Sequence, residues 1–165
     1  MCGLMTQLTY LGLLYNRLTD SLPSEPGLLN QLKKLILLNN ILTGSPPSEF
    51  GLLNQLLDLD LAFNQLTGPL PSELALLTQL LQLHLYNNIL TGSLPFKLGL
   101  MTQLLELYLE DNQLMGSMPV SLCSTRVGIY IDCGEIACTC FASLVLMLTR
   151  MGSVMVAVLL EDFRE

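Results

Sequence analysis

Five asparagines recur along the chain at a strict interval of 24 residues, at Asn16, Asn40, Asn64, Asn88 and Asn112. Each lies in the same pattern, L-x-x-L-x-L-x-x-N-x-L, and all four Leu positions hold Leu in every copy. A fixed period of this length indicates a solenoid, because each unit is too small to bury its apolar face alone and stacks on its neighbours. The sequence therefore predicts one repeat domain over residues 3–122, made of five units without insertions.

Each unit divides into a strand half and an extended half. The last two Leu of L-x-x-L-x-L alternate with variable residues, which is the period-two pattern of a short strand with one buried face. Identical stacked units place these strands side by side in a parallel sheet. A Pro recurs in the second half, where it fixes φ and removes a backbone donor, so we expect extended chain and a short 3₁₀ turn there. These prolines stand at positions 23, 47, 71, 95 and 119.

The repeated Asn is predicted to be buried beside the Leu core, where it cannot remain without hydrogen-bond partners. An unsatisfied buried amide costs about 1–3 kcal/mol, so each is expected to bond the turn backbone of its own and the neighbouring unit, forming a ladder of five rungs. A later turn position holds Gly in four units and Asp20 in the first, where a Cβ is less favourable. We expect looser packing in the first two units, where Pro26 and Pro46 replace larger apolar residues.

Composition excludes several classes of protein. Leu accounts for 44 of the 165 residues and only 13% of the chain is charged, which excludes an intrinsically disordered protein. The net charge of −7 would repel phosphate backbones, so we expect no nucleic-acid partner. Trp is absent and His84 is the single His, so the residues that most catalytic sites require are missing. We therefore expect no enzyme activity and no cofactor.

The second half of each unit carries LTGxxPxxL-type segments, such as LTGPLPSEL and LTGSLPFKL. Together with the Asn-centred half, they make the chain resemble the plant-type subclass of the leucine-rich repeat family, found in plant receptor ectodomains and secreted inhibitors. The resemblance covers residues 3–122. It implies an α/β-type repeat solenoid, a right-handed coil with a parallel concave sheet, an extended or 3₁₀ convex side and little regular α-helix.

The two ends depart from this pattern. Members of the family usually begin with a Cys-bearing cap, whereas residues 1–2 are too short for one and show no signal-peptide pattern. We interpret the chain as N-terminally truncated, with self-association through the uncapped first unit as the alternative. Residues 142–160 form an apolar stretch long enough for a membrane span, although Arg150 makes insertion marginal. A buried or associating tail within residues 141–165, or an artefact of gene prediction, are the alternatives.

Residues 123–140 are predicted to form a Cys-rich C-terminal cap that includes one more strand, Val-Gly-Ile-Tyr-Ile-Asp. The segment is similar to the Cys-rich closures of extracellular algal repeat proteins. Two structural disulfides in an exported protein are the main interpretation, with three possible pairings. A thiolate metal site lacks the paired C-x₂₋₄-C spacing of zinc modules, and reduced buried thiols are the third interpretation. The cysteines concerned are Cys123, Cys133, Cys138 and Cys140.

Positions beside the strand Leu residues are predicted to face outward and to form a partner-binding concave face. Tyr and charged residues at such variable positions are typical of recognition surfaces. One end of this face is apolar and aromatic, and the other is acidic with interleaved Tyr, which favours a protein or peptide partner with a basic or amide-rich segment. The candidate residues are Tyr10, Tyr15, Lys34, Asp58, Asp60, Phe63, Gln82, His84, Tyr86, Glu106, Tyr108, Glu110 and Asp111.

Asp60, His84 and Tyr108 share one column on successive predicted strands, about 4.8 Å apart. A catalytic role is disfavoured because no Ser or Cys nucleophile stands in the adjacent columns. A metal site on an open sheet is equally disfavoured, so the sequence predicts a surface hydrogen-bond ladder in this column.

The sequence thus predicts a non-enzymatic protein- or peptide-binding module, extracellular or at the cell surface, with a cytoplasmic location as the alternative. A second hypothesis is a structural or adhesive fragment that assembles edge to edge or binds a surface such as ice. A third is the ectodomain piece of a larger receptor-like protein.

Overall fold

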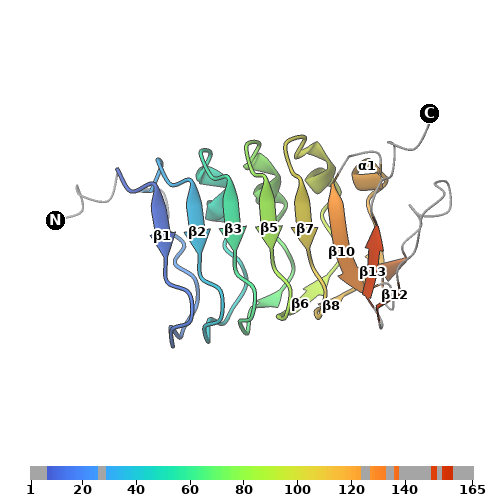
Figure 1. Ribbon diagram of the computed structural model, residues 1–165, viewed down its shortest axis with the longest axis horizontal. Coiled ribbons are helices and arrows are strands. Elements are labelled where there is room, and N and C mark those ends of the chain that lie inside the picture. Colours follow the sequence, from blue (N-terminus) through green and yellow to red (C-terminus); the bar gives the residue numbers. More distant parts are fainter. Residues whose placement is uncertain are drawn as a thin grey trace.

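The computed structural model describes residues 7–25, 29–123, 127–132, 136–137, 150–151 and 154–157. One short strand from each of the five units pairs in parallel with the strand of the next unit, so each residue faces its equivalent 24 positions later. Figure 1 shows these strands side by side along the long axis of the molecule. They are β1 (Tyr10–Gly12), β2 (Lys34–Ile36), β3 (Asp58–Asp60), β5 (Gln82–His84) and β7 (Glu106–Tyr108).

Three further strands continue this sheet towards the C-terminus. β10 (Gly128–Asp132) pairs in parallel with β7, β13 (Val154–Ala157) lies antiparallel to β10, and β12 (Arg150–Met151) lies antiparallel to β13. Within the described parts of the chain, the main sheet has the order β1-β2-β3-β5-β7-β10-β13-β12. Strand residues from the predicted Cys-rich segment and from the apolar stretch therefore extend the repeat sheet.

The remainder of residues 142–160, apart from β12 and β13, lies outside the described residues. Among the residues that the structure describes, no helix has both the length and the apolar character needed to cross a membrane.

The extended halves of the units form a second, smaller parallel sheet. Its strands pair in parallel, with Thr67 opposite Ile89 and Thr91 opposite Gln113. The pairing continues towards the first two units through the bond from Thr67 N–H to Gly44 O, at 2.9 Å, and a bridge between Ser21 and Thr43. The sequence predicts extended chain here but not this pairing, which follows because stacking places each extended segment beside its equivalent. The strands are β4 (Thr67–Gly68), β6 (Ile89–Gly92) and β8 (Gln113–Leu114), and separately β9 (Gly116–Ser117) pairs with β11 (Ile136–Ala137).

Short helical turns form the opposite side of the solenoid. Each 3₁₀ turn begins after a proline, and Pro47 is extended with φ −72° and ψ 141°, which confirms the predicted extended chain and 3₁₀ turn. Between these turns and the main sheet lie the repeated leucines, with Leu59 and Leu83 fully buried. The turns are η3 (Ser48–Leu52), η4 (Ser72–Leu76) and η5 (Phe96–Leu100), followed by the short helix α1 (Val120–Cys123).

The Asn ladder is confirmed from the second unit onward. Asn64 Nδ2 donates to Leu37 O and Leu61 O at 3.1 Å, and its Oδ1 accepts from the Leu42 N–H at 3.0 Å. Asn40, Asn88 and Asn112 make the same set of bonds. Each amide therefore joins its own unit to the preceding one.

Asn16 corrects the prediction of five buried rungs. This side chain is exposed and donates only within its own unit, to Leu13 O at 3.1 Å and Leu14 O at 3.0 Å. No described unit precedes it, so the inter-unit bonds that the other rungs make have no counterpart here. A strictly repeated sequence does not reveal that the first copy lacks the burial of the others.

Two turn positions in each unit adopt a left-handed conformation. Gly44 and its three repeat equivalents have positive φ, and Asp20 takes the same conformation in the first unit with φ 67°. The residue before each ladder Asn is also left-handed, which the sequence does not predict. Asn and Asp tolerate this conformation, but for a ring-bearing residue it is an outlier, as at Phe63 with φ 51° and Tyr15 with φ 53°.

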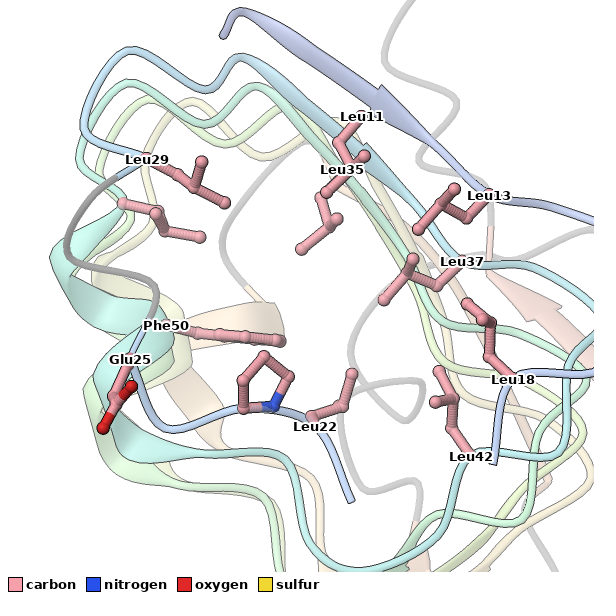
Figure 2. Close-up of a pocket in the computed structure, with 12 residues that line it drawn as sticks. Leu11, Leu13, Leu18, Leu22, Glu25, Leu29, Leu35, Leu37, Leu42 and Phe50 are labelled. Carbon is pink, nitrogen blue, oxygen red and sulfur yellow. The ribbon is translucent and has the colours of Figure 1, made fainter. Parts of the chain in front are cut away.

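An apolar cavity of about 200 Å³ opens between the first and second units (Figure 2). Leu11 and Leu13 line it from β1 and its continuation, and Phe50 lies on the opposite wall. The cavity lies in the region where the sequence predicts looser packing, although Pro46 is buried and Pro26 lies outside the described residues. Among the described residues, the first unit packs against the second unit only, and Leu13 is 37% exposed.

Candidate functional site

The structure brings the predicted residues of the third, fourth and fifth units together at the middle of the concave face. The strand register places Asp60 beside His84, and His84 beside Tyr108. The neighbouring column runs from Lys34 through Asp58 and Gln82 to Glu106. Because every unit has the same length, side chains 24 residues apart become direct neighbours across the sheet.

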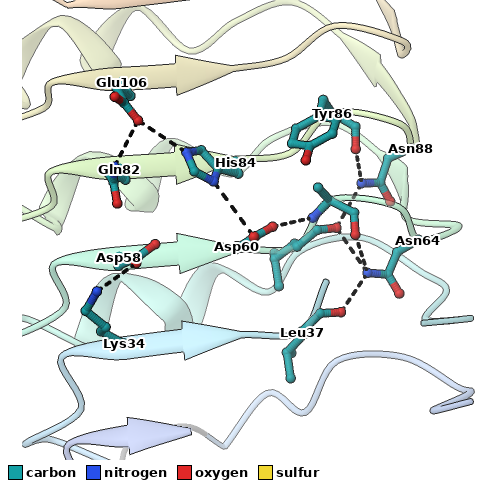
Figure 3. A network of polar contacts seen from close by, with 12 residues as sticks. Lys34, Leu37, Asp58, Asp60, Asn64, Gln82, His84, Tyr86, Asn88 and Glu106 are labelled. Atoms are coloured by element: carbon teal, nitrogen blue, oxygen red, sulfur yellow. Dashed lines mark hydrogen bonds and ion pairs between the residues drawn. The ribbon is translucent and has the colours of Figure 1, made fainter. Parts of the chain in front are cut away.

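The column from Lys34 to Glu106 is joined in pairs. Lys34 Nζ lies 3.2 Å from Asp58 Oδ2, and Gln82 Nε2 donates to Glu106 Oε2 at 2.9 Å. Figure 3 shows both contacts on adjacent strands of the sheet. Asp58 therefore has a cationic partner within the site, whereas the described partner of Glu106 in this column is a neutral amide.

His84 lies between two carboxylates from the flanking strands (Figure 3). Its Nδ1 is 3.8 Å from Asp60 Oδ2, and its Nε2 is 3.7 Å from Glu106 Oε2. Both distances exceed a hydrogen bond, and the contact of His84 with Tyr108 is between rings, so the predicted hydrogen-bond ladder is replaced by ion-pair and ring contacts. Asp60 Oδ1 accepts instead from the Ala62 N–H at 3.0 Å.

Some side chains in this part of the face are more buried than the sequence predicts for outward-facing positions. Asp60 faces the concave side but is only 8% exposed, because its neighbours and the following turn cover it. Ala62, two residues on, is fully buried rather than outward-facing. The strand ends at Asp60 and the chain turns at Phe63, so period-two alternation no longer describes this column.

The surrounding carboxylates favour the charged form of His84. Burial lowers the pKa of His84, whereas Asp60 above all, and then Asp58 and Glu106, raise it. The carboxylates prevail, so the pKa lies above its ordinary value of 6.5. A protonated His84 thus acts as an internal counter-ion for the centre of the concave face.

Aromatic rings form a continuous array beside these charges. Phe63 and Tyr86 meet edge to face at 5.2 Å between centroids, and His84 and Tyr108 do so at 4.8 Å. Tyr86 lies 6.1 Å from Tyr108, which stacks on Tyr130 at 4.1 Å with 3° between the ring planes. We refer to Phe63, Tyr86, Tyr108 and Tyr130 as the aromatic array.

Tyr130 is a site residue that sequence reasoning missed. β10 places it directly opposite Tyr108, although it follows Tyr108 by 22 residues instead of 24. The signal was the predicted strand Val-Gly-Ile-Tyr-Ile-Asp, in which the Tyr has the same position relative to the buried residue as Tyr108 has in β7. The change of spacing after the fifth unit concealed this equivalence.

Acidic groups form the C-terminal end of the face. Burial raises the pKa of Glu110; hydrogen bonds from backbone N–H groups lower it, and the nearby carboxylates of Asp132 and Asp111 raise it further, giving a net increase. The Asp111 N–H donates to Asp132 Oδ2 at 2.6 Å. Burial, and then Tyr130, also raise the pKa of Tyr108, so its hydroxyl stays neutral. Asp132 is a second residue that the candidate set lacked.

Tyr10 and Tyr15 lie at the other end of the sheet and are 53% and 70% exposed. Within the described residues, no ring contact joins either of them to the aromatic array. No group of three or more His, Cys, Asp or Glu side chains in this part of the chain is arranged to hold a metal ion. Cys133, Cys138 and Cys140 lie outside the described residues, so the disulfides stay a prediction.

Comparison with known proteins identifies the family. Residues 31–53, 55–77 and 103–125 match the Leucine Rich Repeat family. The ectodomain of the receptor kinase SOBIR1 from Arabidopsis thaliana shares 30% identity, with a TM-score of 0.66 over 73% of this chain and 68% of that chain. The chain belongs to the leucine-rich repeat family. Its similarity to plant receptor ectodomains and its LTGxxPxxL-type segments make it a leucine-rich repeat protein of the plant type.

Two further solved structures resemble this leucine-rich repeat protein. The ectodomain of the Arabidopsis thaliana receptor kinase GASSHO1/SCHENGEN3, in complex with CASPARIAN STRIP INTEGRITY FACTOR 2, is 40% identical with a TM-score of 0.69. The match covers 70% of this chain but only 14% of that one. A plant ice-binding protein is 34% identical with a TM-score of 0.70, over 75% of this chain and 42% of that one. No curated protein matches the sequence significantly.

Proposed function

We propose that the chain is a non-enzymatic binding module that holds a peptide or protein segment on its concave face, outside the cell. The observation that carries this proposal is the aromatic array beside partly buried carboxylates at the centre of the exposed sheet. Tyr is enriched where interfaces concentrate binding energy, and a rigid solenoid holds such rings without further loss of freedom. Similarity to the ectodomain of the receptor kinase HAESA, solved in complex with a peptide hormone ligand, supports the same role.

Charge favours a basic segment as the partner. Among the side chains that the structure describes, the face carries six carboxylates, and the cationic side chains beside them are Lys34, which pairs with Asp58, and His84. A basic patch on a partner complements this field, and Arg or Lys also binds favourably over the face of a Tyr or Phe ring. The carboxylates are Asp58, Asp60, Glu106, Glu110, Asp111 and Asp132.

A random peptide display selection against the immobilised protein tests this function. We expect the enriched peptides to contain Arg or Lys and to lose at least about tenfold in affinity when Glu106→Lys and Asp111→Lys are combined, because like charges across an interface cost several kcal/mol. Each acid-to-Lys change adds two units of positive charge, so the matched control replaces four exposed neutral residues on and beside the second sheet, Thr43, Gln65, Thr67 and Gln113, by Lys. Enrichment of acidic peptides, or equal losses in both variants, would contradict the proposal.

A second candidate function is binding to an ordered surface such as ice, favoured by similarity to a plant ice-binding protein. The second sheet and the residues next to its strands present a regular uncharged array. In each of these units a buried Leu lies between two residues that face outward, and the units stack in register. We call this array the lateral face. Its exposed members in the second to fifth units are Ile41, Thr43, Gln65, Thr67, Ile89, Gln113 and Met115.

Inhibition of ice recrystallisation checks this second candidate. If it holds, the purified protein inhibits crystal growth, and Thr67→Lys with Ile89→Lys removes the effect because charges disrupt the regular uncharged array. The concave variant Glu106→Lys with Asp111→Lys is expected to keep full inhibition. A wild-type protein without inhibition eliminates this candidate and leaves the peptide-binding proposal unaffected.

A further inference from the structure

His84 occupies a position that links the charge of the concave face to pH. The side chain is 21% exposed and lies between Asp60 on β3 and Glu106 on β7, with nitrogen-to-oxygen distances of 3.8 and 3.7 Å. Its ring packs edge to face against Tyr108 at 4.8 Å, so it forms part of the surface that a ligand on the aromatic array would touch.

The carboxylates facing His84 from the neighbouring strands differ in whether they have a cationic partner other than His84. From β3, Asp58 already has Lys34 as its cation at 3.2 Å. Asp60 and Glu106, in contrast, have His84 as the cationic side chain that they contact among the described residues. The remaining neighbours are neutral: the Gln82 amide on its own strand, the Tyr86 ring after it, and the Tyr108 ring on β7.

Within the described residues, Nε2 of His84 also has no hydrogen-bond partner, although the atom is buried. An imidazolium here therefore offsets part of the charge of two carboxylates without the directional bonds that would fix it in place. A cation placed above Asp60 and Glu106 can take over this role, and a neutral imidazole no longer repels it.

We propose, resting on the function above, that a cationic side chain of the ligand exchanges for the proton of His84. In this exchange the imidazolium loses one proton to solvent, the ring stays in place as a neutral imidazole, and the single positive charge of the ligand Arg or Lys replaces that of His84 beside Asp60 and Glu106. Binding of a basic segment is therefore coupled to deprotonation of His84, and its affinity rises with pH.

The sign follows from linkage. In the free protein the pKa of His84 lies above 6.5, so His84 is charged in mildly acidic solution and competes with the ligand. As pH rises through that pKa, the competing charge disappears and the face becomes more negative by one unit. Release of one proton limits the gain in affinity to about tenfold per pH unit across this range.

The single His in the sequence makes the exchange directly observable, because every imidazole signal in an NMR spectrum of the protein belongs to His84. The probe is a hexa-arginine peptide with blocked ends, and a blocked hexa-serine peptide is the neutral control. Calorimetry at pH 5.5, 7.0 and 8.5 gives the affinity, and an NMR titration with and without saturating probe gives the pKa of His84.

We expect the probe to lower the pKa of His84 by about one unit or more and to bind at least about tenfold more tightly at pH 8.5 than at pH 5.5. The variant His84→Gln keeps a planar side chain of similar reach but cannot titrate, so its affinity should vary with pH only through groups such as Glu110. Hexa-serine is expected to leave the pKa unchanged.

The possible failures are distinguishable. If hexa-arginine binds but the pKa of His84 stays the same, or if His84→Gln keeps the wild-type pH dependence, the proton exchange is wrong and the basic-partner function stands. If hexa-arginine does not bind the folded protein at any pH, the basic-partner function is wrong and the exchange with it. Circular dichroism of His84→Gln verifies that the variant is folded.

Discussion

Replacing Asn64 by Ala is expected to lower the free energy of unfolding by about 3–5 kcal/mol, because the amide holds two units together at their centre. The substitution leaves the buried Leu42 N–H without its acceptor and removes a donor from Leu37 O and Leu61 O. Each orphaned buried group costs about 1–3 kcal/mol. Urea denaturation followed by circular dichroism measures the change.

Asn16→Ala is the matched control, since it removes the same residue at the equivalent position of the first unit. Asn16 is exposed and bonds only its own unit, so we expect a loss below about 1 kcal/mol. Similar losses for the two variants would mean that the amides act locally in each turn and do not join neighbouring units.

Replacing Tyr108 by Ala is expected to weaken binding of the display-selected peptides by about 30-fold or more, or roughly 2 kcal/mol. Tyr108 contacts His84, Tyr86 and Tyr130, so its removal opens the centre of the aromatic array. Fluorescence anisotropy with labelled peptides measures the affinity, and thermal melting checks that the variant stays folded.

Tyr10→Ala provides the comparison for this loss. Tyr10 occupies the first strand of the same sheet and is 53% exposed, but it has no ring contact with the aromatic array among the described residues. We expect a change of less than about threefold, as for most residues outside the central contacts of an interface. Equal weakening by the two variants would place the binding energy elsewhere than on the array.

The repeats could be predicted from sequence because each structural role recurs at the same place in every unit. Leu59 and Leu83 are buried for the same reason, and Asn64 and Asn88 make the same bonds, so one unit explains the rest. Prediction failed where a role depends on position in the stack. Asn16 carries the repeated residue, but its side chain is exposed and bonds only within its own unit among the described residues.

The candidate site was predictable only in part. The 24-residue period correctly made Asp60, His84 and Tyr108 neighbours, because register alone determines which strand positions align. Depth and ring geometry depend on how side chains cover one another, so the burial of Asp60 was not evident. Tyr130 joins the array from a strand that does not follow the 24-residue period, so the period alone did not predict it.

Site-specific photo-cross-linking tests most directly whether the concave face is the binding surface. Benzoylphenylalanine is placed either at Tyr86, within the aromatic array, or at Thr67, on the lateral face, and each protein is irradiated with a display-selected basic peptide. A covalent adduct from position 86 and none from position 67 is the expected result. Adducts from position 67 alone would show that the peptide binds the lateral face and would contradict the proposed site.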